Sequence, residues 1–101
     1  MSFSDVKQAK ELKSRLSQTQ KELSNTLVEA NAGKGAVKVI MDGQQRIKVI
    51  EISPSVMDPE KTKQLESLIM KAINDATNKS QKAAAKQFKA LTGGIKIPGL
   101  M

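Results

Sequence analysis

The sequence predicts an α+β protein with an N-terminal helix, a small antiparallel sheet of about three strands, and a long C-terminal helix or helix pair. Apolar residues recur at helical spacing near both ends of the chain, and a glycine-punctuated stretch rich in β-branched residues lies between them. A length of 101 residues fits one domain, so residues 1–101 are expected to form a single unit whose tail, residues 93–101, is flexible. Aromatic residues make up only 2% of the chain, and its core must therefore be aliphatic.

The first helix is predicted over residues 4 to about 25. Ser4 can cap its amino terminus, and Asp5 places a negative charge near the positive end of the helix dipole. Six apolar residues fall within about 120° of one another when each residue advances the helix by 100°. They are Val6, Ala9, Leu12, Leu16, Leu23 and Leu27. The helix is therefore expected to carry one apolar stripe.

Three short strands are expected between residues 26 and 52. The candidates are residues 26–30, 36–41 and 45–52. The sequence Asp42-Gly43 separates the last two and is a strong hairpin signal. Residues 31–35 are expected to form a flexible joint, because Gly33-Lys34-Gly35 lacks the spacing of a phosphate-binding loop.

The register of the second hairpin follows from its side chains. A two-residue loop would mix apolar and charged residues on one face, whereas a three-residue loop, Asp42-Gly43-Gln44, pairs apolar residues with each other. It places Val37 opposite Val49 and Val39 opposite Ile47. We therefore predict an odd-length loop with a glycine bulge and a second face that is only partly buried. The residues on that second face would be Lys38, Ile40, Lys48 and Ile50.

A second helix is predicted from Asp58 to about Leu91. Asp58-Pro59-Glu60 combines a cap, a proline at the first helical position and an acid near the positive end of the dipole, and no breaker follows until Gly93-Gly94. A continuous helix of this length would be roughly 50 Å long, while a six-residue strand spans about 20 Å. Whether the helix breaks near Asn78 is left open. Because one small sheet cannot cover both long helices, a second protomer is expected to do so.

The composition argues against an enzyme. The chain contains no His, Cys, Tyr or Trp, so it lacks the usual near-neutral acid or base, the thiolate and most metal ligands. No catalytic residue, cofactor, metal or small-molecule substrate is therefore expected. The sequence shows no secretory signal and no apolar window approaching the roughly 18 residues of a membrane span. A cytoplasmic protein without a membrane partner is expected.

The net charge indicates a polyanionic partner. Seventeen basic residues oppose ten acidic ones, which gives +7, and no acid follows Asp75. Five lysines of the second helix form a ribbon about 80° wide, as a helix laid against phosphates requires. Together with two lysines of the first helix they are the predicted DNA contacts: Lys7, Lys10, Lys71, Lys79, Lys82, Lys86 and Lys89. The alternative interpretation is a solvated face that keeps an alanine-rich helix soluble.

Double-stranded DNA fits this composition better than a single strand does. Unpaired bases normally stack on aromatic side chains, and Phe3 and Phe88 are the only aromatic residues of the chain. Lysine suits phosphate contacts, whereas base-specific reading of guanine more often uses arginine, and only Arg15 and Arg46 are present. Low sequence specificity is therefore expected.

Six segments of the chain, in this order, carry a resemblance to a known family. They are the Gln/Lys/Glu-rich first helix, Gly33-Lys34-Gly35-Ala36-Val37-Lys38-Val39 leading to Asp42-Gly43, Val49-Ile50-Glu51-Ile52-Ser53-Pro54, Ala72-Ile73-Asn74-Asp75-Ala76, Leu91-Thr92-Gly93-Gly94-Ile95, and Pro98-Gly99-Leu100. With them, nearly the whole chain resembles the YbaB/EbfC family of nucleoid-associated proteins.

The resemblance implies a small antiparallel sheet between helical arms, an intertwined homodimer, and binding of double-stranded DNA in the nucleoid, with effects on nucleoid organisation and gene expression. It supplies no residue-level DNA motif, so the seven lysines rest on charge and helical face alone. The alternative function is a helical protein-interaction adaptor without significant DNA binding. A peripheral membrane protein is disfavoured, because alanine-rich apolar positions without Trp give little insertion energy.

Overall fold

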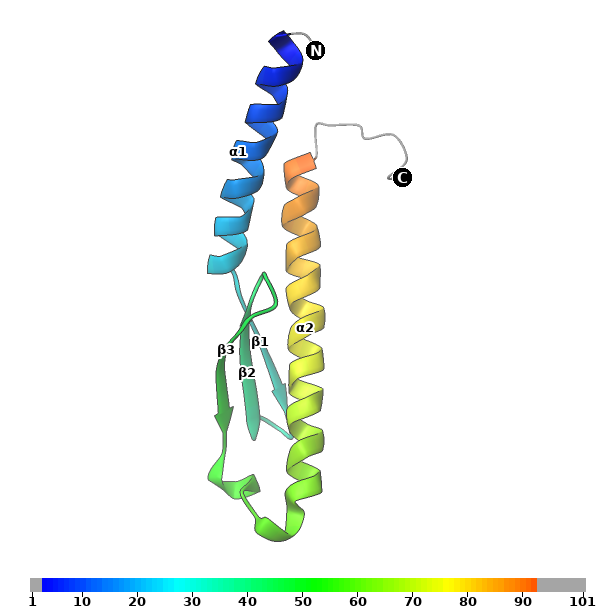
Figure 1. Cartoon of the computed structure of the whole chain (residues 1–101). Helices are drawn as coiled ribbons and strands as arrows, with labels where there is room; N and C mark the ends of the chain where they lie inside the picture. Colours follow the sequence, from blue (N-terminus) through cyan, green and yellow to red (C-terminus); the bar gives the residue numbers. More distant parts are fainter. Residues whose placement is uncertain (1–2, 93–101) are drawn as a thin grey trace.

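Two long helices and a three-stranded antiparallel sheet make up the computed structural model, which describes residues 3–92 (Figure 1). In chain order the elements are α1 (Phe3–Asn25), β1 (Leu27–Ala32), β2 (Val37–Asp42), β3 (Ile47–Ile52), the 3-10 helices η1 (Pro54–Val56) and η2 (Pro59–Lys61), and α2 (Thr62–Thr92). The predicted class and order of elements are confirmed. The tail predicted to be flexible, residues 93–101, lies outside the described residues.

Helix α2 is continuous through Asn78, which answers the question that the sequence left open. Its predicted start is confirmed as a cap, although the cap belongs to η2. The carboxylate of Asp58 accepts a hydrogen bond from the backbone N–H of Glu60 (2.9 Å), and Pro59 follows at the first position. The α-helical geometry then begins at Thr62.

The sheet has the order β1-β2-β3, and both neighbouring pairs are antiparallel. The prediction of a flexible joint over residues 31–35 is wrong: Asn31 and Ala32 belong to β1, and residues 33–36 form a tight hairpin turn between β1 and β2. In this turn the backbone N–H of Ala36 donates a hydrogen bond to the carbonyl oxygen of Gly33 (3.2 Å). Lys34 and Gly35 adopt left-handed φ values of 58° and 86°. Glycine tolerates that conformation without steric cost, which explains the glycine-rich sequence of this turn.

The predicted register of the second hairpin is wrong by three residues. Val37 lies opposite Ile52 rather than Val49, and Val39 lies opposite Ile50 rather than Ile47. As a result Ile50 faces the same side of the sheet as Val39, while Val49 takes the opposite side beside Ile40. The predicted faces of Val49 and Ile50 are therefore wrong, whereas Ile47 lies opposite Met41 on the predicted face.

Two local features produce the observed register. The loop spans residues 43–45, because the N–H of Asp42 pairs with the carbonyl of Arg46 (2.9 Å), and its left-handed residue is Gln45 (φ 65°) rather than a glycine. A bulge then shifts the pairing between Ile40 and Met41, which leaves Lys48 as the extra residue of β3. Without that bulge Glu51 would take the place of Ile52 on the buried face, and burying an unpaired carboxylate is costly.

The core lies between α2 and the first two strands. Its fully buried residues on the helix side, Ala72 and Ala76, are small, and larger residues of α2 pack beside them and are partly buried: Leu65, Leu68, Ile69 and Ile73. The small size of Ala72 and Ala76 lets α2 approach the sheet closely. The sheet side of this core is formed by Ala30, Ala32, Val37, Val39 and Met41.

The molecule is long and thin, with principal extents of 68 × 25 × 18 Å. Its radius of gyration is 19.2 Å, whereas a compact chain of about 100 residues has a radius near 13 Å. Helix α2 covers β1 and β2 but not β3, so Ile47 and Ile50 of β3 each stay 44% exposed. One chain therefore leaves a large share of its apolar residues uncovered.

Candidate nucleic-acid interface

Helix α1 and the C-terminal part of α2 lie side by side and extend beyond the sheet in the same direction (Figure 1). They run antiparallel, so the amino end of α1 and the carboxyl end of α2 lie at the same end of the molecule. We call α1 together with residues 79–92 of α2 the arm. A groove of about 310 Å³ separates the two helices and is lined by Arg15, Gln18, Thr19, Glu22, Gln87, Ala90 and Leu91.

Four of the predicted DNA contacts lie on the α2 side of the arm, and all four are exposed: Lys79, Lys82, Lys86 and Lys89. Neither Lys82 nor Lys86 forms an ion pair with any other residue of the described range 3–92. Lys71 is also exposed, but it lies on the part of α2 that packs along the sheet. The structure therefore separates Lys71 from the other lysines of the ribbon.

Lys79 has an intramolecular partner. Its ammonium group donates a hydrogen bond to the backbone carbonyl oxygen of Glu29 in β1 (2.7 Å). Because β1 is an edge strand, this bond satisfies a carbonyl that no neighbouring strand can reach. A phosphate would have to compete with that bond, so Lys79 is the least available of the four lysines on the arm part of α2.

The two predicted contacts on α1, Lys7 and Lys10, are exposed near its amino end. Lys21 is also exposed, and it lies on the same face of α1, within about 60° of both at 100° per residue. It was absent from the predicted contacts although the same wheel angle would have identified it. The basic face of α1 therefore extends over most of the helix.

The lysines of both helices face the same side of the arm. On α2 they lie roughly 80–160° from the groove residue Gln87 in one sense of rotation, at 100° per residue. On α1, Lys7 and Lys10 lie roughly 60–120° from the groove residue Glu22 in the same sense. Because the helices are antiparallel, equal senses of rotation lead to the same side of the pair. We call this side the lysine face.

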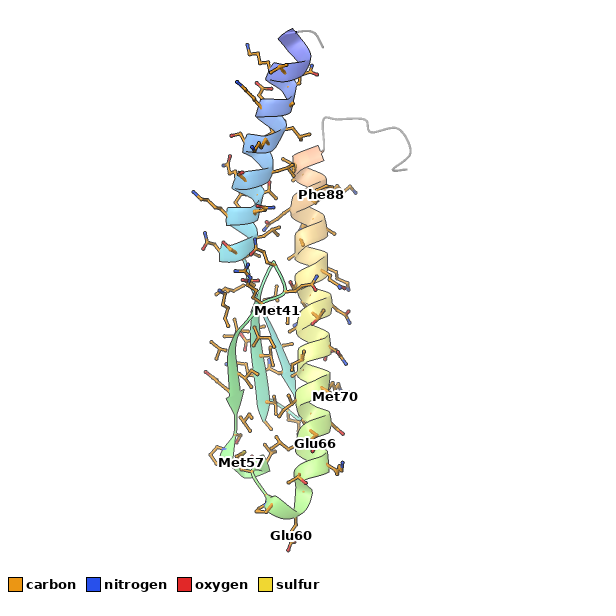
Figure 2. The ribbon with its side chains drawn as sticks, viewed as in Figure 1. Met41, Met57, Glu60, Glu66, Met70 and Phe88 are labelled. Atoms are coloured by element: carbon orange, nitrogen blue, oxygen red, sulfur yellow. The ribbon has the colours of Figure 1, made fainter. Side chains whose placement is uncertain are left out.

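The opposite side of the arm is apolar. Leu12 and Leu16 of α1 are 42% and 38% exposed, and Phe88 of α2 is 50% exposed. Figure 2 shows Phe88 towards the carboxyl end of α2 and Met70 nearer its start. Met70 lies at the same wheel angle as Phe88 and is 64% exposed. Met70 beside the sheet and Phe88 on the arm therefore lie on one flank of α2, and we call this flank and the stripe of α1 the apolar face.

The chain matches the YbaB/EbfC DNA-binding family over residues 3–95. It belongs to this family. Several nucleoid-associated proteins are similar to it along nearly their whole length. The protein of Pelotomaculum thermopropionicum is 41% identical over 95 residues, which cover 94% of this chain and 90% of that protein. The protein of Syntrophobacter fumaroxidans is 39% identical over 98 residues, covering 97% and 89%.

The fold of this YbaB/EbfC chain is also similar to a solved structure. The crystal structure of an uncharacterized protein from Helicobacter pylori superposes with a TM-score of 0.72 at 24% sequence identity. The match covers 94% of this chain and 97% of that one. The predicted resemblance and the fold class are both confirmed.

Among the side chains that the structure of this YbaB/EbfC chain describes, one carboxylate is buried, that of Asp42 at the base of the arm. Its Oδ1 accepts hydrogen bonds from the backbone N–H groups of Gln44 (2.8 Å) and Arg46 (3.0 Å), and its Oδ2 lies 3.6 Å from Nζ of Lys48. Burial alone raises the pKa of Asp42, but the two N–H donors and the Lys48 ammonium outweigh it, so the pKa lies below its ordinary value. Sequence patterns identified Asp42 only as a turn residue.

Neither a metal centre nor a membrane span is found in the part of this YbaB/EbfC chain that the structure describes. Within residues 3–92 no group of three or more acidic, His or Cys side chains could hold a metal ion. No helix in that range is both long and apolar enough to cross a membrane.

Proposed function

We propose that this protein binds double-stranded DNA with low sequence specificity through the lysine face of its arm, as a homodimer and without enzymatic activity. The observation that carries the proposal is that lysines from two helices face one side of a projecting arm. Phosphate contacts dominate affinity for DNA, and exposed ammonium groups on rigid helices can supply them. Such binding places the protein on the nucleoid in the cytoplasm, where it affects nucleoid organisation and gene expression.

The homodimer is supported by the apolar face. Leu12, Leu16 and Phe88 on the arm are each at least 38% exposed, and Ile47 and Ile50 of β3 are exposed beyond the edge of α2. Several large apolar residues exposed together favour an interface over a solvated surface. A second copy offers the same residues, so a two-fold arrangement would cover both apolar faces at once and leave both lysine faces in solvent.

Low specificity is supported by the positions of the arginines and of Phe88, the residues that could read or stack on bases. Arg15 lines the groove between α1 and α2, and Arg46 lies beside the turn between β2 and β3, so neither belongs to the lysine face. Phe88 lies on the apolar face and offers no stacking platform for bases. Lysine contacts with phosphates position a protein on DNA but carry no sequence information.

The test is a titration of a fluorescent random-sequence duplex at several salt concentrations, with sedimentation to fix the oligomeric state. The variant replaces Lys82 and Lys86 with glutamine. A matched control makes the same replacement at Lys61, the last residue of η2, and at Lys63 in the first turn of α2, where Lys63 pairs with Glu66 (3.7 Å). Both variants lose the same charge, and only the first alters the arm.

The expected result is a dimer whose affinity falls as salt rises. The slope of log K against log salt should decrease by roughly 0.9 for each arm lysine that contacts a phosphate, and the Lys61/Lys63 control should keep the wild-type slope. Equal losses in both variants would show a general charge effect and refute the lysine face. A dimer that ignores DNA at low salt would favour the protein-adaptor function, and binding only to anionic vesicles would favour the membrane function.

A further inference from the structure

The carboxyl end of α1 is held by the turn between β2 and β3. The backbone N–H of Gly43 donates to the carbonyl of Leu23 (2.8 Å), and the side-chain amide of Gln44 donates to the carbonyl of Gln20 (3.1 Å). The last four carbonyls of a helix, which here include that of Leu23, have no partner within the helix. The turn therefore caps α1 and fixes its end against the sheet.

Helix α2 holds the same turn from its other side. The buried hydroxyl of Ser80 donates to the backbone carbonyl of Asp42 (2.7 Å). Farther along α2, the side-chain amide of Gln87 donates to Oγ1 of Thr26 (2.7 Å), and the Thr26 hydroxyl in turn donates to the carbonyl of Glu22 (2.7 Å). Hydrogen bonds thus connect α2, the turn and the end of α1. We call Thr26, Asp42, Gly43, Gln44, Ser80 and Gln87 the root junction.

Gly43 occupies the tightest point of the root junction. A Cβ atom at this position would lie 2.8 Å from the carbonyl oxygen and 2.9 Å from Cδ2 of Leu23. Its backbone is not left-handed, so glycine is required here by the close approach of α1. Any larger side chain has to push the end of α1 away from the turn.

The remainder of α1 has few restraints within the chain. Every residue from 6 to 18 is exposed, and the only buried residue of the helix among those with described side chains is Thr19. Lys7 lies 16 residues before Leu23, which is about 24 Å along a helix at 1.5 Å per residue. A tilt of about 10° at the root junction would therefore displace Lys7 by roughly 4 Å.

We infer that the root junction positions α1 so that its lysines reach DNA together with those of α2. The inference rests on the proposed function, and it assigns Gly43 and its hydrogen-bonded neighbours as positioning residues that act on DNA only through the direction of α1. Asp42 and Ser80 fix the turn to α2, and the turn fixes α1. Loss of this link leaves every lysine in place but separates the two halves of the lysine face.

The first test measures the direction of α1 directly. The chain has no cysteine, so spin labels at Ser14→Cys on α1 and Ala85→Cys on α2 report one intrachain distance when labelled protein is diluted with an excess of unlabelled protein. Gly43→Ala should shift or broaden this distance distribution. Gly35→Ala is the matched control. Its φ of 86° makes alanine strained there too, but an added Cβ would meet no atom within 4 Å, and the position lies in the other hairpin, away from α1.

The second test connects the direction of α1 to DNA. In the salt titration, Gly43→Ala should lower the slope as much as the double variant Lys7→Gln/Lys10→Gln does, by roughly 0.9 for each lost phosphate contact. Combining Gly43→Ala with that double variant should lower the slope no further, because both changes remove the same contacts. A loss of stability without a change in direction would not produce this non-additivity.

Three outcomes would overturn the inference: an unchanged distance distribution in Gly43→Ala, the same change in Gly35→Ala, or additive losses of slope. If Gly43→Ala does not fold, Gln44→Ala combined with Ser80→Ala removes two hydrogen bonds of the root junction without a steric clash and carries the same expectations. The two hypotheses fail separately. A wild-type chain that ignores DNA refutes the proposed function, while the distance measurement still decides whether the root junction directs α1.

Discussion

Replacing Asp42 with asparagine is expected to destabilise the folded chain by about 1–2 kcal/mol at neutral pH. The carboxylate is fully buried, and its Oδ1 accepts two backbone N–H bonds, from Gln44 (2.8 Å) and Arg46 (3.0 Å). A hydrogen bond to a charged group contributes about 1.5–3 kcal/mol, against about 1 kcal/mol for a neutral pair. Asparagine keeps the accepting oxygen but loses the charge, and it places its amide near the ammonium of Lys48. That ammonium is 45% exposed and contributes little itself.

The contribution of Asp42 also has a defined dependence on pH. Its pKa is lower in the folded chain than its ordinary value, so the unfolded chain binds the proton more readily. The stability that the carboxylate contributes is therefore complete above the unfolded pKa, near 3.9, and is lost as the pH falls through the folded pKa. The difference between wild type and Asp42→Asn should be largest near pH 7 and should shrink below about pH 4.

Thermal melting at fixed protein concentration measures both effects. A loss of 1 kcal/mol lowers the Tm of a domain of this size by about 4–8 °C, so Asp42→Asn should melt roughly 10 °C below wild type. Asp58→Asn is the control, because asparagine caps a helix as well as aspartate does and should leave the Tm nearly unchanged. Equal melting of Asp42→Asn and wild type at pH 7, or a difference that persists undiminished at pH 3, would refute the reasoning.

Three further predictions concern the sheet, the lysine face and the core. Ile50→Glu should shift the dimer towards monomer in sedimentation, and the control Val49→Glu on the other face of β3 should not; equal dissociation would contradict a dimer interface that includes the exposed Ile50 side of β3. Lys79→Gln should lower DNA affinity less than Lys86→Gln in the duplex titration, because Lys79 is bonded to β1; the reverse order would contradict this. Ala76→Leu should cost about 1–3 kcal/mol in a melt by overpacking the contact between α2 and the sheet, and an unchanged Tm would refute that close contact.

Helical spacing predicted both long helices and their positions, because each pattern extends over many turns and does not depend on tertiary contacts. The hairpin register could not be predicted this way. It depends on the Asp42 side chain, which accepts the N–H groups of Gln44 and Arg46 and so begins the loop one residue later. It also depends on a bulge at Lys48, for which the alternation of apolar residues gave no signal.

Charge and wheel angle predicted the lysines as a set, and the structure places six of the seven predicted lysines on the arm. Lys71 is the exception. What the sequence could not predict is the relation between the helices, since a wheel gives angles within one helix but not the direction of its neighbour. The hydrogen bond from Lys79 to the Glu29 carbonyl of β1 could not be predicted for the same reason. Both require the tertiary contacts of α2.

The sequence of α2 shows how one helix can serve three purposes. Ala72, Ala76 and Ser80 face the sheet and are fully buried, and because they are small they bring the helix close to β1 and β2. Beside this contact, the lysines on one flank of α2 and Met70 and Phe88 on the other stay exposed. Under the proposed function, DNA binding and dimer formation would therefore use different sides of the same helix. Larger residues at these three positions would push α2 away from the sheet and shift both flanks relative to α1, so under the proposed function the small residues would matter for DNA binding as well as for packing.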